Sequence, residues 1–271
     1  MELEEFLKNN KISEVKDIKF PIKKIKATQD YVMIFLDDEK IMISLEAYFK
    51  YNVKSLKGLD DNLYSIFKDD EKYLKAYRGC LRKISSKDHS VKQIRDYLYK
   101  TELDKATIDS IIDRLKEYKL LDDDKYCINK INYYNNSSLS TKQIKLKLKN
   151  DGISEELIKQ HLNTNDEMEY AKALKIASKY SNVKSKSTSA LKQSVLTKLV
   201  GNGFSYEISK RAVDSLIINN KNELELLRKE YDKALRKYEK KYENYDLRNH
   251  IYAYLINKGF RSDDIKEVME V

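Results

Sequence analysis

Short β-branched and aromatic runs mark the beginning of the chain. Tyr31–Leu36 and Ile41–Leu45 flank the polar stretch Asp37–Lys40, an arrangement that predicts a β-hairpin. Ile22–Lys26 alternates Ile with Lys and adds a third predicted strand. A meander this small needs a helix packed on one face. The helical patterns that serve as candidates are Leu45–Tyr51 and Asn62–Phe67.

From about residue 70 the apolar pattern takes a helical period and repeats. Four apolar pairs at i and i+4 each predict one face of a helix. Their second members are leucines that follow one another at intervals of 50, 51 and 56 residues. The pairs are Ile94/Leu98, Ile144/Leu148, Val195/Leu199 and Ile251/Leu255.

A recurring turn follows three of these pairs. Four residues after the leucine comes a glycine, then an apolar residue, then a serine, with Arg261 inserted before the serine in the last copy. Glycine adopts the left-handed conformation that ends a helix, and the serine is expected to cap the next one. The glycines are Gly152, Gly203 and Gly259, and the serines are Ser154, Ser205 and Ser262. The first copy has Glu102 in place of glycine, so its turn must be closed differently.

A longer amphipathic helix precedes each pair, so each repeat contains one long and two short helices. We therefore predict a mainly α protein: tandem three-helix repeats in an elongated array, after a small N-terminal β-meander. The predicted boundaries are 1–69 for the β-containing segment and 70–121, 122–164, 165–219 and 220–271 for repeats 1 to 4.

Composition supports this interpretation. Only 6 residues of 271 are Gly and 1 is Pro, too few for the frequent turns of an all-β protein. The start, MELEEFLKNN, lacks the features of a signal peptide, and the longest apolar run is far shorter than the ~20 residues that span a bilayer. Cys80 and Cys127 form no CxxC pattern, which fits a reduced interior. We expect a soluble, cytoplasmic monomer.

Motifs for catalysis are absent from the sequence. It contains no GxxxxGK[ST] loop and no GxSxG, and His89, His161 and His250 are scattered. The acidic run Asp122–Asp124 has two readings, a divalent-metal site or a helix start, and the helix start is favoured. We predict a protein that is not an enzyme and uses neither metal nor cofactor.

Charge placement is the informative feature. Lys and Arg number 53 against 44 Asp and Glu, a net charge of +9, which favours polyanions or acidic surfaces as partners. Two windows, 125–150 and 170–206, hold many lysines and no acid. Lysines could simply solvate helices in a Lys-rich proteome, but two such windows in adjacent repeats favour a basic binding surface. The candidate binding residues are Lys142, Lys145, Lys149, Lys184, Lys186 and Lys192.

Two segments carry a family resemblance. Leu115–Tyr126, LKEYKLLDDDKY, is similar to the link between the first two repeats of the RecX family, and Thr141–Ile153, TKQIKLKLKNDGI, resembles its second-repeat pattern. The prefix through Leu56–Leu59 resembles longer members of that family. Members often carry an Arg-rich segment before the second helix of repeat 1. Here Ser85–Ser90 keeps a serine cap but lacks the arginines, which puts their contact in doubt.

The resemblance implies a regulator of homologous recombination. Such a protein binds the RecA–DNA filament, RecA on single-stranded DNA, in its helical groove and inhibits ATPase activity, strand exchange or filament growth. The alternative is a direct DNA-binding protein that uses the basic repeats without contacting RecA. A third possibility is a scaffold whose lysines only solvate its helices.

Overall fold

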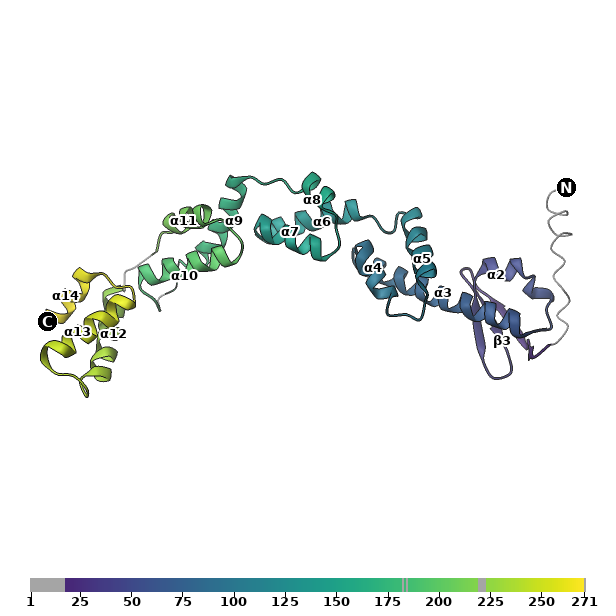
Figure 1. Cartoon of the computed structure of the whole chain (residues 1–271), viewed down its shortest axis with the longest axis horizontal. Helices are drawn as coiled ribbons and strands as arrows, with labels where there is room; N and C mark the ends of the chain where they lie inside the picture. Colours follow the sequence, from purple (N-terminus) through teal and green to yellow (C-terminus); the bar gives the residue numbers. More distant parts are fainter. Residues whose placement is uncertain (1–17, 182, 184, 219–222, 271) are drawn as a thin grey trace. The chain divides into compact units, whose positions relative to one another are not determined.

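The structure is a computed structural model that describes residues 18–181, 183, 185–218 and 223–270. It divides into two compact units, residues 1–126 and 127–271. The predicted mainly helical fold with a small antiparallel sheet is confirmed (Figure 1). The stretch MELEEFLKNN and Lys184 lie outside the described residues.

The β-meander begins the first unit. Strands β2 (Lys24–Ala27), β3 (Val32–Phe35) and β4 (Lys40–Ile43) form an antiparallel sheet in that order. Ile25 pairs with Ile34, which in turn pairs with Ile41. The shorter strands β1 (Phe20–Pro21) and β5 (Gly58–Leu59) pair with each other. All three strands of the predicted meander are therefore present.

Two helices cover the meander. They are α2 (Leu45–Lys50) and the first part of α3 (Asp61–Ser86), with the short 3-10 turn η1 (Val53–Ser55) between them. Val32, Ile34, Ile41 and Ile43 are buried against Ala47, Leu63 and Phe67 from these helices. Both helical patterns expected to pack on the sheet do so.

Helix α3 also supplies the first helix of repeat 1 (Figure 1). It runs without interruption through the predicted boundary at residues 69 and 70, because no Gly or Pro lies within it before Gly79. Its second half packs with α4 (Val91–Leu98) and α5 (Lys105–Glu117). The β-meander and repeat 1 therefore share one helix.

Three further repeats follow, each with three helices. Helix α6 starts at the acidic run and crosses the division between the two units. In repeat 2 the helices are α6 (Asp123–Asn136), α7 (Thr141–Asn150) and α8 (Glu155–His161). In repeat 3 they are α9 (Asp166–Ser178), α10 (Thr188–Gly201) and α11 (Tyr206–Asp214). In repeat 4 they are α12 (Glu223–Tyr238), α13 (Asn244–Asn257) and α14 (Ser262–Glu270).

The predicted apolar pairs form the centre of each repeat. All eight side chains are buried, and Leu98, Leu148, Leu199 and Leu255 are fully so. Around the pairs of repeats 1, 3 and 4 lie separate hydrophobic clusters with no residue in common. Cys80 and Cys127 are buried free thiols, and burial raises the pKa of Cys80 to about 11. No described helix is long and apolar enough to cross a membrane.

The glycine turns form as expected. Gly152 and Gly203 have φ of 84° and Gly259 has φ of 81°, the left-handed region that favours glycine. Ser154 and Ser205 cap α8 and α11 by accepting hydrogen bonds from backbone N–H groups.

Two turn details differ from the simple pattern. The prediction that Ser262 is a cap is wrong: α14 already includes Ser262, whose hydroxyl instead lies 2.8 Å from the Tyr252 hydroxyl. In repeat 1, where Glu102 replaces glycine, the end of α4 is closed by the Thr101 hydroxyl, which donates to the Leu98 carbonyl at 2.6 Å. This closure needs no left-handed residue at position 102.

Candidate partner-binding surfaces

Buried serines join repeat 2 to repeat 3 and repeat 3 to repeat 4. Ser140 Oγ donates to the Asn202 carbonyl at 2.6 Å, and Ser187 Oγ donates to the Lys258 carbonyl at 2.7 Å. Each carbonyl belongs to the residue before the turn glycine of the following repeat. The same two serines also cap α7 and α10. We call each such contact a serine joint.

An acid completes each serine joint. Glu169 of α9 accepts from the Thr141 backbone N–H at 3.2 Å and from its hydroxyl at 2.9 Å. Glu223 of α12 accepts from the Thr188 backbone N–H at 3.0 Å and from its hydroxyl at 2.7 Å. The carboxylates meet the positive ends of α7 and α10, which stabilises negative charge there. The N-termini of α7 and α10 therefore already bind a carboxylate of the protein, and their first N–H groups are not available to an external anion.

A related contact links repeat 1 to the start of α6. The Val91 N–H, at the beginning of α4, donates to Asp123 Oδ1 at 2.8 Å. The acidic run therefore serves helix ends: Asp123 accepts from α4, and Asp122 Oδ1 accepts from the Asp124 and Lys125 N–H groups. Among the described residues, no group of His, Cys, Asp and Glu is arranged to hold a metal ion.

The predicted lysines of α7 are partly neutralised. Lys145 and Lys149 both form ion pairs with Glu155 of α8, at 3.6 Å for Lys145. Lys149 lowers the pKa of Glu155 through this hydrogen bond, so the carboxylate stays charged. Glu155 lies outside the acid-free window, yet the turn at Gly152 folds it back onto α7. Lys142 is exposed and has no ion pair in the described part of the chain.

Two further predicted lysines are described: Lys186 precedes α10 and Lys192 lies within it. Lys186 is exposed, and its Nζ donates to Ser194 Oγ at 3.1 Å. Lys192 is half-buried and lines a groove of about 560 Å³. We call it the α10–α11 groove. Its lining residues are Thr188, Ser189, Lys192, Gln193, Leu196, Tyr206, Lys210, Val213, Asp214, Glu223, Gly259 and Arg261. Lys210, Tyr206 and Arg261 are members that the sequence did not single out.

One lysine–tyrosine pair recurs in every repeat. One member of the pair directly precedes the core leucine of the second helix, as Tyr97 precedes Leu98 in α4. The other member lies seven or eight residues, about two helical turns, before that second helix begins, as Lys83 does. The ammonium-to-ring distances are 4.6, 5.7, 4.9 and 5.5 Å in repeats 1 to 4. The pairs are Lys83–Tyr97, Lys147–Tyr134, Lys198–Tyr180 and Lys237–Tyr254. Lysine and tyrosine exchange places between repeats while the contact remains.

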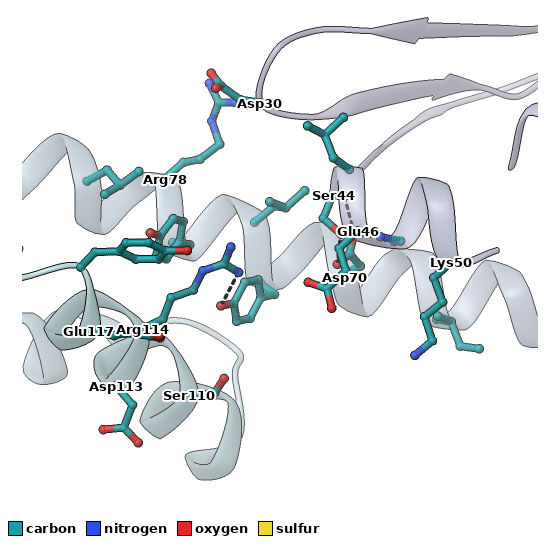
Figure 2. Close-up of a pocket in the computed structure, with 18 of the residues that line it drawn as sticks. Asp30, Ser44, Glu46, Lys50, Asp70, Arg78, Ser110, Asp113, Arg114 and Glu117 are labelled. Carbon is teal, nitrogen blue, oxygen red and sulfur yellow. Dashed lines mark hydrogen bonds between the residues drawn. The ribbon is translucent and has the colours of Figure 1, made fainter. Parts of the chain in front are cut away.

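A larger groove lies in the first unit. It has a volume of about 1680 Å³ and is lined by residues of α2, α3 and α5. Figure 2 shows Arg114 reaching from α5 to a tyrosine of α3; its guanidinium donates to the Tyr73 hydroxyl at 3.4 Å and lies over the Tyr77 ring. Arg78 lies over the Tyr31 ring at 4.5 Å. Acids outnumber cations along the lining, so this groove has no preference for polyanions.

The histidines have local contacts. His250 stacks on Tyr242, with 3.8 Å between ring centroids, and His89 Nδ1 lies 2.8 Å from the Lys87 carbonyl. His161 ends α8. These contacts hold side chains in place and offer no nucleophile–base pair.

Tandem three-helix repeats after an N-terminal β-meander define this as a helical-repeat protein. The family model described as "RecX, first three-helix domain" matches residues 76–115, and "RecX, third three-helix domain" matches residues 221–269. The latter falls on the fourth repeat of this chain.

Whole-chain similarity agrees with the family models. The chain is 31% identical over 258 residues to "Regulatory protein RecX" of Streptococcus gordonii, covering 92% of this chain and 98% of the relative. It is 37% identical over 191 residues to the protein of that name from Streptococcus mutans, covering 69% and 73%. A crystal structure of regulatory protein RecX shares the fold, with a TM-score of 0.55 and 21% identity over 72% of this chain and 100% of that one. The chain belongs to the RecX family of regulatory proteins.

Proposed function

We propose that this protein binds the RecA–DNA filament and inhibits RecA's ATPase activity, strand exchange or filament growth, without catalysing a reaction itself. The observation that carries the proposal is the match to regulatory RecX proteins over nearly the whole length of both chains. RecA acts on chromosomal DNA, so we place the protein in the bacterial cytoplasm.

The repeated architecture supports this partner. A filament offers the same surface many times, and tandem repeats offer several related surfaces on one chain. Linked weak contacts of this kind give a much higher overall affinity than any one contact. The net charge of +9 favours an anionic partner and predicts that binding weakens as salt rises.

We propose that Lys142, Lys145, Lys149, Lys184, Lys186 and Lys192 contribute to this binding, and that the protein acts as a monomer. Because Glu155 pairs with Lys145 and Lys149, the lysines to test first are Lys142, Lys186 and Lys192.

The test is RecA's single-strand-dependent ATPase activity at rising concentrations of this protein. Wild-type protein should inhibit well below the concentration that shifts naked DNA in a gel. A variant with Lys142, Lys186 and Lys192 changed to Glu should need a much higher concentration. A matched control changes the exposed Lys57, Lys87 and Lys100 to Glu.

Both variants lower the net charge from +9 to +3, since each of three changes removes two charges. They differ only in where the charge is lost. Unchanged ATPase activity at stoichiometric amounts of wild-type protein would contradict the RecA proposal. Equal loss in the two variants would contradict the proposed lysines and leave bulk charge as the cause.

A second candidate function is direct DNA binding without RecA. The observation that favours it is the α10–α11 groove, which gathers Lys192, Lys210 and Arg261. A DNA shift at the same or lower protein concentration than ATPase inhibition would make this the primary activity.

A further inference from the structure

The α10–α11 groove gathers three cations. Within the residues that the structure describes, Lys192, Lys210 and Arg261 form no ion pair. Two acids line the same groove. Glu223 is engaged with Thr188 at the serine joint, which leaves Asp214 as the acid that opposes three cations.

Comparison with repeat 2 shows why Lys192 has no acid to pair with. Lys192 stands at the same distance from its N-cap, Ser187, as Lys145 does from Ser140. Three residues after the turn glycine, repeat 2 has Glu155, which pairs with Lys145. The corresponding residue of repeat 3 is Tyr206. An aromatic ring therefore stands where repeat 2 has the neutralising acid.

The ring of Tyr206 is open to solvent. Its side chain is 55% exposed, and no ring or cation in the described part of the chain covers its faces. This distinguishes Tyr206 from Tyr134 and Tyr180, whose rings lie under lysines. An open tyrosine face at the first turn of α11 can stack on a planar group.

We infer that the α10–α11 groove binds single-stranded nucleic acid, with Lys192, Lys210 and Arg261 contacting phosphates and Tyr206 stacking on an unpaired base. Clustered cations beside an open aromatic ring are the two elements of sequence-tolerant single-strand binding. A duplex offers phosphates but keeps its base faces stacked, and an acidic peptide offers charge without a planar base. The groove chemistry thus favours a single strand over both.

This inference rests on the second candidate function, direct DNA binding at this groove, and deepens it by naming a single strand as the ligand and Tyr206 as the residue that stacks on its base. It is tested with the full-length protein and a fluorescein-labelled oligo(dT) of about 12 nucleotides, by anisotropy over a series of salt concentrations. Changing Lys192, Lys210 and Arg261 to Ala should make the plot of log association constant against log salt concentration less steep by about 2. Each lost phosphate contact contributes about 0.7 to that slope for a single strand.

The ring is tested separately. Tyr206→Leu should weaken oligo(dT) binding about tenfold, whereas Tyr206→Phe keeps the stacking face and should bind like wild type. The matched control is Lys57→Ala with Lys87→Ala and Lys100→Ala, which removes three exposed lysines that do not line the groove and should leave binding unchanged. Glu155→Tyr should strengthen binding, because it frees Lys145 and Lys149 from their ion pairs and adds a ring. Circular dichroism checks that each variant is folded.

Several results would overturn the inference. These are unchanged binding by the triple variant, equal binding by the Leu and Phe variants, a duplex bound as tightly as the single strand, or competition by polyglutamate at equal charge. RecA is absent from all these measurements. Failure of ATPase inhibition would therefore refute the proposed function and leave the DNA result standing, and the reverse also holds.

Discussion

At the scale of single residues, Gly203 and Gly259, the turn glycines of the two serine joints, occupy positions that exclude other residues for two reasons. Gly259 has a φ of 81°, and a Cβ there would lie 2.8 Å from Ser187 Oγ and 3.0 Å from the Ala190 backbone nitrogen. At Gly203 a Cβ would lie 2.9 Å from Ser140 Oγ. Conformation and close approach both demand glycine at these positions.

Gly259→Ala should therefore lower the free energy of unfolding by ~2–3 kcal/mol, from left-handed strain of ~1–2 kcal/mol plus the contact with backbone. The measurement is urea unfolding followed by circular dichroism. Gly201→Ala is the matched control: nothing lies within 4 Å of its Cβ position, and α10 includes it. That change should be neutral or stabilise by up to ~1 kcal/mol. Equal effects of the two substitutions would contradict the joint geometry.

The sequence predicted the turn glycines but not the hydroxyls that approach them. Gly followed by an apolar residue and Ser is a local signal, readable because helix ends need left-handed residues. The bond from Ser140 to Asn202 joins residues far apart in the chain, and its acceptor is a backbone carbonyl that any residue would supply. The ion pair of Glu155 with Lys145 was missed for a similar reason, since only the folded turn brings the two side chains together.

At the scale of helices, the joint between repeats 2 and 3 contains a buried ion pair. Lys172 Nζ donates to Glu169 Oε1 at 2.9 Å, and both side chains are about nine-tenths buried. The same carboxylate accepts from Thr141. Removing one charge of such a pair strands the other in a medium that solvates it poorly.

We expect Glu169→Gln to lower the free energy of unfolding by ~3 kcal/mol, since the amide still accepts from Thr141 but leaves Lys172 unpaired. Adding Lys172→Met should recover most of that loss, because methionine fills similar space without charge. Thermal unfolding of the two variants and of Lys172→Met alone checks this. If the double variant loses as much as the two single variants summed, the stranded charge is not the cause.

The lysine–tyrosine pairs permit an exchange experiment. Repeat 1 has lysine on the first helix and tyrosine on the second, whereas repeat 2 has the opposite arrangement. Tyr134→Lys alone should cost ~1–2 kcal/mol, from the lost cation–π contact and lost ring burial. Adding Lys147→Tyr should restore at least half of that free energy, measured by urea unfolding. Additive losses in the double variant would show that the two side chains act independently.

Helix α3 shows the limit of prediction at this scale. The sequence predicted its first part, over Asn62–Phe67, and the apolar face that serves repeat 1, but placed a boundary between them. The intervening Lys68, Asp69 and Asp70 are polar. Asp70 instead accepts from the Ser44 N–H and hydroxyl, so a polar residue ties the helix to the β-meander. The sequence signal for one continuous helix is that no Gly or Pro occurs in this stretch before Gly79.

At the scale of the whole molecule, stability is divided among repeats. The described clusters of repeats 1, 3 and 4 share no residue, and contact between repeats 3 and 4 includes the serine joint. Proteins of this kind unfold with a stability that sums repeat and neighbour terms. A core substitution should therefore act mainly where it is made.

Leu255→Ala should destabilise repeat 4 by ~2–5 kcal/mol, because its side chain is fully buried. Hydrogen exchange should show lost protection across α12, α13 and α14, with a smaller loss at the first turn of α10, which the Ser187 joint connects to repeat 4. Protection in α4 and α5 should be unchanged. Uniform loss throughout the chain would mean a single cooperative fold.

The serine joints also bear on how a chain like this changes length. Each joint presents Ser–Thr on one side and an acid with a turn glycine on the other, and the Ser140 and Ser187 joints are interchangeable in these parts. Excision of residues 141–187 would bring Ser140 directly before Thr188 and rebuild the same connection to Glu223 and Gly259. Such an excision shortens the chain by the length of about one repeat and keeps the residues of the joint, while α6 takes the place of α9 beside α10.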